Sequence, residues 1–303
     1  MPGRRDRLIE EISVISRRRL GRVACAFALG LIPARSARAL APTLAADLAR
    51  IEAESGGRLG VAVLDRVSGA QAGHRTDERF PLCSTFKLLA AAALLSRVDA
   101  GDERLDRRLH FEERDLVVYS PVTQRYAGAP GMPLADVCAA AITVSDNTAA
   151  NLLLAEIGGP AGLTAYVRSL GDRVTRLDRR EPELNEALPD DPRDTTSPAA
   201  MVADLDALLI GNALSGESRH RLTGWLLAGK TGDARLRAGV PNGWQVGEKT
   251  GTGERGTAND VGILWPPGRS PALVAVYLTQ SPQSGDQRNA IIADVVRAIA
   301  AAL

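Results

Sequence analysis

Residues 244–280 read WQVGEKTGTGERGTANDVGILWPPGRSPALVAVYLTQ. This stretch holds three runs that alternate or are continuously apolar, Trp244–Thr252, Ala258–Trp265 and Ala272–Gln280, with turn-forming residues between them. Runs of this length predict consecutive antiparallel strands, and the apolar segment Asp286–Leu303 predicts a closing helix. The end of the chain is therefore expected to form a β-meander covered by a helix.

A second strand region lies near the start of the chain. A polar helical stretch, Thr43–Glu54, precedes a buried strand, Leu59–Asp65, and a turn at Ser68-Gly69 leads to a short strand at Ala70–Arg75. Between the two strand regions the apolar spacing is helical. The expected helices are Ser84–Asp99, Pro133–Ile142, Thr148–Ile157, Pro160–Leu170, Ser197–Leu209 and Ser215–Leu226. We therefore predict an α/β protein of the α+β type, with one sheet built from both ends of the chain (40–80 and 228–303) and a helical insert (81–227).

The chain of 303 residues carries 37 basic and 36 acidic side chains, unevenly distributed. Residues 1–39 hold nine arginines and three acidic residues, which leaves a net charge of −5 on residues 40–303. A mildly acidic body without a basic stripe disfavours nucleic acid as a partner. The arginines precede a short apolar run, Val23–Pro33, and a small-residue pattern, Ala37-Arg38-Ala39, so residues 1–39 are predicted to be a cleaved secretory signal of the twin-arginine type. We expect an exported protein, periplasmic or secreted, without a stable membrane anchor; an amphipathic N-terminal helix that stays attached is the alternative.

Lysine is rare in this chain, which uses arginine for nearly all of its positive charges. Only Lys87, Lys230 and Lys249 occur, and an ammonium, unlike a guanidinium, can lose its proton when buried. Ser84-Thr-Phe-Lys87 places a hydroxyl and an ammonium three residues apart at the start of a helix, on one face, where the serine can act as a nucleophile. A capped helix with a surface lysine would show the same spacing.

Two further motifs carry polar groups suited to catalysis. Ser145-Asp146-Asn147 lies on a short connection before a helix, where these residues could cap the helix or face a cleft. Lys-Thr-Gly occurs twice, once on an expected strand, where a ligand can add along the strand edge. We predict that Lys249-Thr250-Gly251 is the functional copy and that the copy at Lys230 is a surface coincidence.

A loop of unusual composition separates two of the expected helices. Asp178–Thr196 is charged, contains three prolines and has no apolar period. Within it, Glu181 and Asn185 are four residues apart, so a carboxylate and an amide could hold one water between a general base and its orienting partner. Solvated surface is the alternative for a charged loop. Arg179 and Asp194 flank the pair.

Taken together, these motifs resemble one known family. The order Ser-x-x-Lys, Ser-Asp-Asn, Glu-x-x-Leu-Asn and Lys-Thr-Gly, with Tyr119–Thr123, Ala141–Leu154 and Asp191–Thr196, is similar to that of class A serine β-lactamases over the whole mature chain. The resemblance implies a five-stranded antiparallel sheet with flanking N- and C-terminal helices, an inserted all-helical domain, and an active site in the crevice. It also implies hydrolysis of the β-lactam amide of penicillins and related antibiotics through a serine acyl-enzyme, which gives antibiotic resistance.

The same resemblance implies a role for each site residue. Ser84 is the expected nucleophile, with either Lys87, or Glu181 acting through a water, as its base, and Ser145 gives a proton to the lactam nitrogen. The backbone N–H groups of Ser84 and Thr252 are expected to form the oxyanion hole. Contacts to substrate or to the hydrolytic water are expected from Asn147, Asn185, Lys249, Thr250, Gly251, Tyr119 and Arg235. No metal or cofactor is implied.

One position departs from the commonest form of the family. An arginine that contacts the substrate carboxylate from the strand after Lys-Thr-Gly would fall at Ala258 here. Some members supply this guanidinium from the preceding segment, so we assign the role to Arg235. The resemblance also places a disulfide partner of Cys83 at Gly253 and one of Cys138 at Ala91, so two free thiols are expected.

Two other classes of protein share part of the pattern. A D-alanyl-D-alanine carboxypeptidase or transpeptidase uses similar motifs but normally lacks the loop glutamate, so Glu181 with Asn185 argues against it. A β-lactam sensor domain is acylated without turnover and is usually tethered to a membrane partner, for which the mature chain shows no segment. The family resemblance implies a monomer and leaves the preference among penicillins, cephalosporins and carbapenems open.

Overall fold

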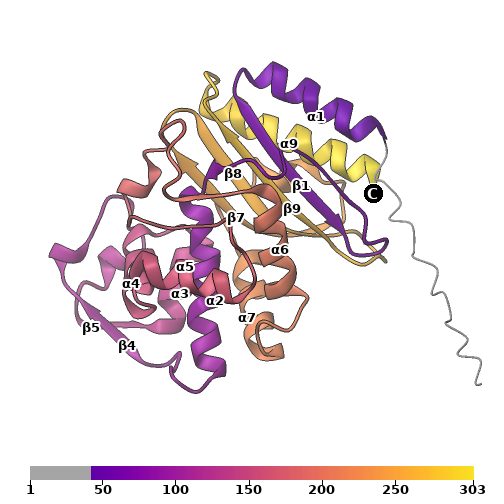
Figure 1. Cartoon of the computed structure of the whole chain (residues 1–303). Helices are drawn as coiled ribbons and strands as arrows, with labels where there is room; N and C mark the ends of the chain where they lie inside the picture. Colours follow the sequence, from indigo (N-terminus) through magenta and orange to yellow (C-terminus); the bar gives the residue numbers. More distant parts are fainter. Residues whose placement is uncertain (1–41) are drawn as a thin grey trace, which may run out of the picture. The chain divides into compact units, whose positions relative to one another are not determined.

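The computed structural model describes residues 42–303, which form a central sheet with helices on both faces (Figure 1). The sheet is antiparallel, in the order β2 (Gln71–His74), β1 (Arg58–Asp65), β9 (Ala272–Thr279), β8 (Thr257–Trp265) and β7 (Gln245–Gly253). The predicted meander is confirmed as β7, β8 and β9, and the N-terminal hairpin joins it where β1 pairs with β9. The export signal predicted for residues 1–39 lies outside the described residues.

The burial of β9 explains why the sheet carries helices on both faces. Every residue of β9 is buried, and successive side chains of a strand point to opposite faces. Leu273, Ala275 and Tyr277 pack into the apolar core on one side of the sheet, whereas Val274 and Val276 pack into the core on the other. A strand buried on both faces requires the continuous apolar run that this sequence has.

The terminal helices cover one face of the sheet. α1 (Pro42–Ser55) and α9 (Gly285–Ala302) lie side by side there (Figure 1), and their apolar residues share a core with Val274 and Val276. α9 begins with a capping box in which Ser284 and Gln287 each accept a hydrogen bond from the backbone N–H of the other. The short helix α8 (Leu236–Gly239) also packs on α9, and it was not predicted because a single turn leaves no periodic pattern.

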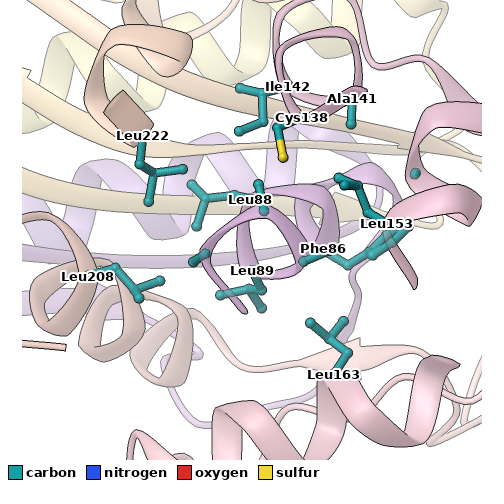
Figure 2. Packing of buried hydrophobic residues seen from close by; sticks show 14 of the residues in the cluster. Phe86, Leu88, Leu89, Cys138, Ala141, Ile142, Leu153, Leu163, Leu208 and Leu222 are labelled. Atoms are coloured by element: carbon teal, nitrogen blue, oxygen red, sulfur yellow. The ribbon is translucent and has the colours of Figure 1, made fainter. Parts of the chain in front are cut away.

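The inserted helices cover the other face. They are α2 (Phe86–Asp99), α3 (Leu134–Thr143), α4 (Asn147–Glu156), α5 (Gly159–Ser169), α6 (Pro198–Leu209) and α7 (Gly216–Leu227). α2 is the central one, because Phe86–Leu95 are all buried and apolar side chains of the neighbouring helices surround them (Figure 2). A helix that is apolar all round has to be enclosed in this way. The 3₁₀ turn Cys83–Thr85 before α2, which carries Ser84, is thereby fixed where the helical part meets β7 and β8, and Lys87 follows in the first turn of α2.

The insert is not entirely helical, in contrast to the expectation. β4 (Arg108–Phe111) pairs with β5 (Gly128–Pro133), and β3 (Phe80–Pro81) pairs with β6 (Thr195–Thr196). β5 contains two glycines and two prolines, which are depleted in strands, so its composition carried no strand signal. β3 and β6 are only two residues long, but their pairing ties the segment before Ser84 to the end of the 178–196 loop.

Candidate active site

Ser84 lies on a 3₁₀ turn, Cys83–Thr85, that runs directly into α2. Cys83 has a left-handed backbone conformation, with φ of 43°, and Tyr119 and Ser145 are left-handed as well, with φ of 67° and 60°. Such conformations cost a non-glycine residue about 1–3 kcal/mol and persist only where the surrounding structure imposes them. Tyr119, Ser145 and Ser84 line the same cavity. Three of the strained residues thus lie at or next to the cavity where the predicted catalytic residues meet.

The cavity has a volume of about 360 Å³. Its lining residues are Ser84, Tyr119, Ser145, Asn147, Asn185, Thr231, Arg235, Thr250 and Thr252, all of which except Thr231 were predicted for the site. The other four predicted residues, Lys87, Glu181, Lys249 and Gly251, are buried. As the following contacts show, the structure brings the predicted residues together.

Ser84 and Lys87 both contact one oxygen of Glu181. Ser84 Oγ donates a hydrogen bond to Glu181 Oε1 at 3.2 Å, and Lys87 Nζ lies 3.0 Å from the same oxygen. Burial lowers the pKa of Lys87, and the charge of Glu181 opposes this shift. The Glu181 carboxylate is therefore within proton-transfer distance of both the Ser84 hydroxyl and the Lys87 ammonium.

Ser145 lies between the two buried lysines. Its Oγ accepts hydrogen bonds from Lys87 Nζ at 3.3 Å and from Lys249 Nζ at 3.1 Å. Burial lowers the pKa of Lys249 well below its usual range, and the neighbouring charge of Lys87 lowers it further. Because both lysines donate to Ser145 Oγ, the hydroxyl hydrogen of Ser145 remains available to a group in the cavity.

The other two residues of the Ser-Asp-Asn segment have different tasks. Asp146 caps α4 by accepting from the N–H of Ala149 at 2.8 Å, and it also accepts from the N–H of Val122 at 2.9 Å. Asn147 accepts from Lys87 Nζ through Oδ1 at 2.6 Å and donates from Nδ2 to the Val118 backbone oxygen at 2.9 Å. An amide nitrogen has two hydrogens, so Asn147 keeps one for a ligand.

Helix α4 holds Glu181 in place through Asn151. The Glu181 N–H donates to Asn151 Oδ1, and Asn151 Nδ2 donates to the Glu181 backbone oxygen, both at 2.9 Å. Asn151 was not predicted as a site residue, although an asparagine among the alanines and leucines of α4 is a signal because its amide needs a partner. Asn185 Nδ2 donates to Glu181 Oε2 and to the Pro182 backbone oxygen. Asn185 Oδ1 is buried and accepts no hydrogen bond from the part of the chain that the structure describes.

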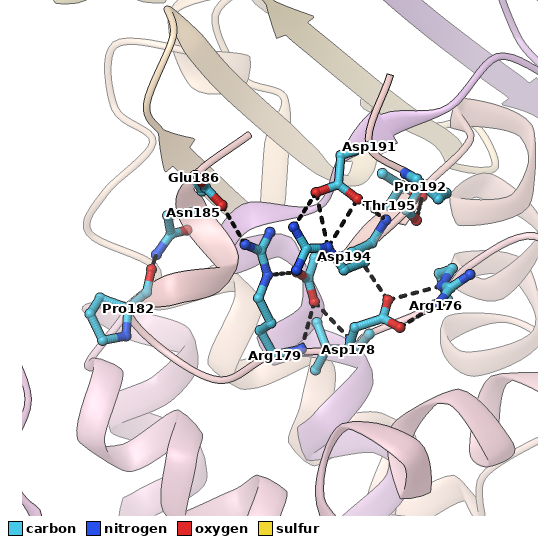
Figure 3. A network of polar contacts seen from close by, with 12 residues as sticks. Arg176, Asp178, Arg179, Pro182, Asn185, Glu186, Asp191, Pro192, Asp194 and Thr195 are labelled. Atoms are coloured by element: carbon cyan, nitrogen blue, oxygen red, sulfur yellow. Dashed lines mark hydrogen bonds and ion pairs between the residues drawn. The ribbon is translucent and has the colours of Figure 1, made fainter. Parts of the chain in front are cut away.

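An ion pair closes the base of the loop that carries Glu181 (Figure 3). Asp194, which is 1% exposed, accepts from the backbone N–H groups of Asp178 and Arg179 at 2.7 and 2.9 Å. It also accepts from Arg179 Nε at 2.6 Å, and Arg179 in turn contacts Glu186 at 2.6 Å. Arg179 and Asp194, which flank Glu181 and Asn185 in the sequence, thus form an ion pair whose network fixes both ends of the loop.

Arg235 lies at the cavity, but most of its hydrogen bonds go to the protein. Nη1 donates to the backbone oxygens of Gly251 and Asn259 at 2.8 and 2.7 Å. Nη2 donates to Thr252 Oγ1 and Nε to Asn289 Oδ1, both at 2.8 Å. A guanidinium has five N–H hydrogens, so four are used and one is left. Arg235 can therefore contact a ligand through a single hydrogen, while its charge acts on the whole cavity.

Two acidic side chains are buried on β7 and β8 close to Arg235. Asp260 Oδ2 accepts from the N–H of Leu236 at 3.1 Å and so holds the residue that follows Arg235. Burial, and then the charge of Asp260, raise the pKa of Glu248 to about 10, and burial raises the pKa of Asp260 to about 6. This shift favours the neutral carboxyl group, while Arg237 Nε, 3.3 Å from Glu248 Oε1, acts in the opposite direction. The Glu248 carboxyl group occupies space that only a glycine leaves, because a Cβ at Gly232 would lie 2.0 Å from Glu248 Oε1.

The first Lys-Thr-Gly copy is part of the site, which corrects the prediction that it is a surface coincidence. Lys230 is exposed, but Thr231 lines the cavity and its hydroxyl oxygen lies 2.6 Å from that of Thr250. This contact joins segments that are 19 residues apart, so the spacing within either copy could not reveal it.

The two cysteines of the described residues, Cys83 and Cys138, are unpaired and buried. A Cβ at Gly253 would lie 2.6 Å from Cys83 Sγ, so position 253 does adjoin this thiol. Burial raises the pKa of both thiols, which keeps them protonated and unreactive. Within residues 42–303, no group of three or more histidine, cysteine or acidic residues is arranged to hold a metal ion.

Comparisons with known proteins agree with this site. The family model described as the β-lactamase enzyme family matches residues 43–303. β-Lactamase AST-1 of Nocardia asteroides is 49% identical over 255 residues, which are 84% of this chain and 82% of the relative. The structure of the ancestral class A β-lactamase GNCA is 61% identical with a TM-score of 0.85, over 86% of this chain and all of the other. PenP of Rhodopseudomonas palustris is 62% identical with a TM-score of 0.85, over 86% of this chain and 100% of its own.

The matches span the sheet and the helical part, and therefore every segment that contributes to the cavity. Both the sequence identity and the agreement of the folds are far above what a shared architecture alone would give. The chain belongs to the class A β-lactamases, serine hydrolases that open the β-lactam amide of penicillins and related antibiotics and so confer resistance to them.

Proposed function

We propose that Ser84 attacks the β-lactam carbonyl and that its proton reaches the lactam nitrogen through Glu181, Lys87 and Ser145. The observation that carries this proposal is a continuous line of contacts. Ser84 Oγ lies 3.2 Å from Glu181 Oε1, that oxygen lies 3.0 Å from Lys87 Nζ, and Lys87 Nζ lies 3.3 Å from Ser145 Oγ. Each step is short enough for direct proton transfer.

Acylation opens the β-lactam ring and moves one proton from Ser84 to the lactam nitrogen. A bond forms between Ser84 Oγ and the carbonyl carbon, the carbon–nitrogen bond of the ring breaks, and Glu181 accepts the serine proton. Ser145 gives its hydrogen to the lactam nitrogen and is reprotonated by the Lys87 ammonium, which then takes the proton from Glu181. The direct hydrogen bond from Ser84 to Glu181 supports Glu181 as the acceptor of the serine proton. At the end, Ser84 is acylated, and Glu181, Lys87 and Ser145 are back in their starting protonation states.

The backbone N–H groups of Ser84 and Thr252 would stabilise the negative charge on the carbonyl oxygen. β7 packs on the Cys83–Thr85 turn, and Gly251 makes this approach possible, because a Cβ there would lie 3.0 Å from the Leu82 backbone oxygen. Loss of one such donor raises the barrier by about 3–4 kcal/mol in serine hydrolases.

Glu181 and Asn185 would direct the water that hydrolyses the acyl-enzyme. The buried Asn185 Oδ1, which lacks a partner among the described residues, can accept one hydrogen of this water, and Glu181 can accept the other. Glu181 then takes a proton from the water as the water oxygen bonds to the acyl carbon, the ester bond to Ser84 breaks, and Glu181 gives that proton to Ser84 Oγ.

The remaining lining residues would bind the substrate. Lys249, Thr250, Thr252 and Arg235 provide positive charge and hydrogen-bond donors for its anionic group. Asn147 would donate its second amide hydrogen to the acylamino side chain. Tyr119, whose side chain is 56% exposed at the edge of the cavity, would cover the bound antibiotic.

Export of the protein is a further part of the proposed function. Residues 1–39 would direct the chain to the periplasm or the medium, and residues 40–303 would act there as a monomeric catalytic unit. Across residues 42–303, no helix is both long and apolar enough to cross a membrane.

The test is steady-state hydrolysis of benzylpenicillin by the purified protein, with intact mass recorded during the reaction. Glu181→Gln removes both the acceptor of the Ser84 proton and the base for the hydrolytic water, so it should be acylated more slowly than the wild type and deacylated more slowly still. A penicilloyl adduct should therefore accumulate, and turnover should fall at least about 1,000-fold. Glu183→Gln, an exposed glutamate on the same loop, is the matched control and should turn over normally.

Two other outcomes would change the role assigned to Glu181 or the proposed function of the protein. Glu181→Gln protein that is acylated as fast as the wild type would exclude Glu181 as the acceptor of the Ser84 proton and leave Lys87. A stable adduct on the wild-type protein, without turnover, would contradict the hydrolytic role of Glu181 and favour a penicillin-binding or sensor protein.

A further inference from the structure

Thr231 comes from the Lys-Thr-Gly copy that has no place in the proposed mechanism. Its hydroxyl oxygen is 2.6 Å from that of Thr250, and both residues line the cavity. The segment that carries Thr231 is held at both ends: the Lys230 N–H donates to the Thr143 backbone oxygen of α3, and Arg235 Nη1 donates to the Gly251 backbone oxygen of β7, both at 2.8 Å. These contacts hold the 231–235 segment against β7.

A count of hydrogens shows what this contact does. Each threonine hydroxyl has one hydrogen and two lone pairs, and a single hydrogen bond between Thr231 and Thr250 consumes only one of the two hydrogens. The other hydrogen is left for a third group. Lys249 and Arg235 make this side of the cavity positive, so the third group that fits is an anion.

In the Thr231–Thr250 pair either hydroxyl can be the donor, whereas the direction of the hydrogen bond to Thr252 is fixed. Arg235 Nη2 donates to Thr252 Oγ1 at 2.8 Å, and because a guanidinium can only donate, the Thr252 oxygen is the acceptor. The hydroxyl hydrogen of Thr252 is thus free to point at a ligand. Thr231 therefore contacts the hydroxyl of Thr250, and Arg235 contacts the hydroxyl of Thr252. Each contact leaves one hydroxyl hydrogen available to a ligand.

We propose that Thr231 is a positioning residue that directs a hydroxyl hydrogen of the Thr231–Thr250 pair onto the anionic group of the β-lactam. This inference rests on the proposed function and deepens it, since it adds a specificity-determining residue to the anion-binding side of the site. Its consequence is selectivity: a substrate that carries a carboxylate gains from the pair, whereas the same substrate with a neutral ester gains much less.

The test compares Thr231→Val and Thr231→Ser on benzylpenicillin and on its methyl ester. Thr231→Val keeps the shape of the side chain but removes the hydroxyl, so KM for the free acid should rise about tenfold with kcat changed less than about threefold. The preference for the acid over the ester should fall by a similar factor. Thr231→Ser, which retains the hydroxyl, should restore most of the preference.

A hydroxyl pair elsewhere in the sheet provides the matched control. Thr257 and Thr279 are 2.8 Å apart on β8 and β9 and do not line the cavity. Thr279→Val should leave the acid-to-ester preference unchanged; an equal loss there would mean that the ratio reports sheet packing, and the proposal would fall.

The remaining outcomes separate this inference from the proposed function. The role of Thr231 is overturned if Thr231→Val prefers benzylpenicillin over its methyl ester as strongly as the wild type does. It is also overturned if KM rises equally for the acid and the ester. In both cases the hydrolytic function stands. Wild-type protein that does not turn over benzylpenicillin overturns the proposed function itself.

Discussion

Replacing Asp204 by asparagine should stabilise the protein, and more strongly as the pH rises. Asp204 lies on α6 with 2% of its surface exposed, and its carboxyl group is within hydrogen-bond reach of the Asp172 carboxylate. Burial, and then the charge of Asp172, raise the pKa of Asp204 to about 9. Asp204 is therefore protonated at neutral pH and can donate to Asp172, which accepts from the N–H groups of Val174 and Thr175 at 2.6 and 3.0 Å. The pair supports the segment that leads into the loop of Glu181.

The sign and size of the effect follow from proton linkage. The ordinary pKa of an aspartate is 3.8, so between there and about 9 the folded protein holds a proton that the unfolded chain releases. The free energy of unfolding then falls by about 1.4 kcal/mol per pH unit in this range. Asparagine keeps the donor to Asp172 and does not titrate. The stability of Asp204→Asn relative to the wild type should therefore grow by about 4 kcal/mol from pH 5 to pH 8.

Urea denaturation followed by tryptophan fluorescence at several pH values from 5 to 8 measures this difference. The pH slope of the difference between the two proteins is the decisive quantity, because all other titrating groups are common to both. Asp206→Asn, on the same helix with a side chain that is 29% exposed and paired with Arg66, controls for the loss of one carboxylate from α6. Parallel curves for wild type and Asp204→Asn would refute the reasoning, since they would show that Asp204 is ionised in the folded protein.

Three shorter predictions concern the site. Asp194→Asn should lower the free energy of unfolding by about 3 kcal/mol and reduce turnover, because it leaves the partly buried Arg179 without its main carboxylate; thermal melting and kcat check this. Gly253→Cys should form a disulfide with Cys83, because a Cβ at position 253 would lie 2.6 Å from Cys83 Sγ. Intact mass measured with and without reductant checks this, and two free thiols in the unreduced protein would contradict it. Glu248→Gln should keep kcat/KM within about twofold at pH 7, because burial and the charge of Asp260 raise the pKa of Glu248 to about 10 and glutamine reproduces its neutral form. A tenfold loss would show that Glu248 is charged and that its contact with Arg237 at 3.3 Å is an ion pair the site needs.

The parts of the fold that were predictable are those with a long periodic pattern. β9 is buried along its whole length and α2 is buried from Phe86 to Leu95, so for these elements the apolar pattern in the sequence and the burial in the structure coincide. The single turn of α8 and the glycine- and proline-rich β5 have no such pattern, because their geometry depends on their neighbours.

Chemical motifs identified most site residues, but not those whose role depends on a distant partner. Thr231 was misassigned because its contact with Thr250 crosses between two segments. Asp204 gave no signal, because an aspartate in a helix ordinarily belongs to the solvent face, and only the packing of α6 reveals its burial. Arg235 was assigned to the cavity from the sequence, yet four of its five hydrogens are committed to the protein, which no motif could show.

The charges of the two buried lysines explain how binding and chemistry are coupled under the proposed mechanism. Lys87 has a counter-ion in Glu181 at 3.0 Å, whereas the hydrogen bonds of Lys249 go to Ser145 Oγ at 3.1 Å and to the Thr250 backbone oxygen at 2.8 Å, both uncharged. A buried ammonium without a paired anion is costly, which is why the pKa of Lys249 is lowered. An anionic substrate group beside Lys249 supplies the missing charge and raises that pKa again. The ammonium that polarises Ser145, and with it the proton for the lactam nitrogen, is therefore stabilised by the substrate itself.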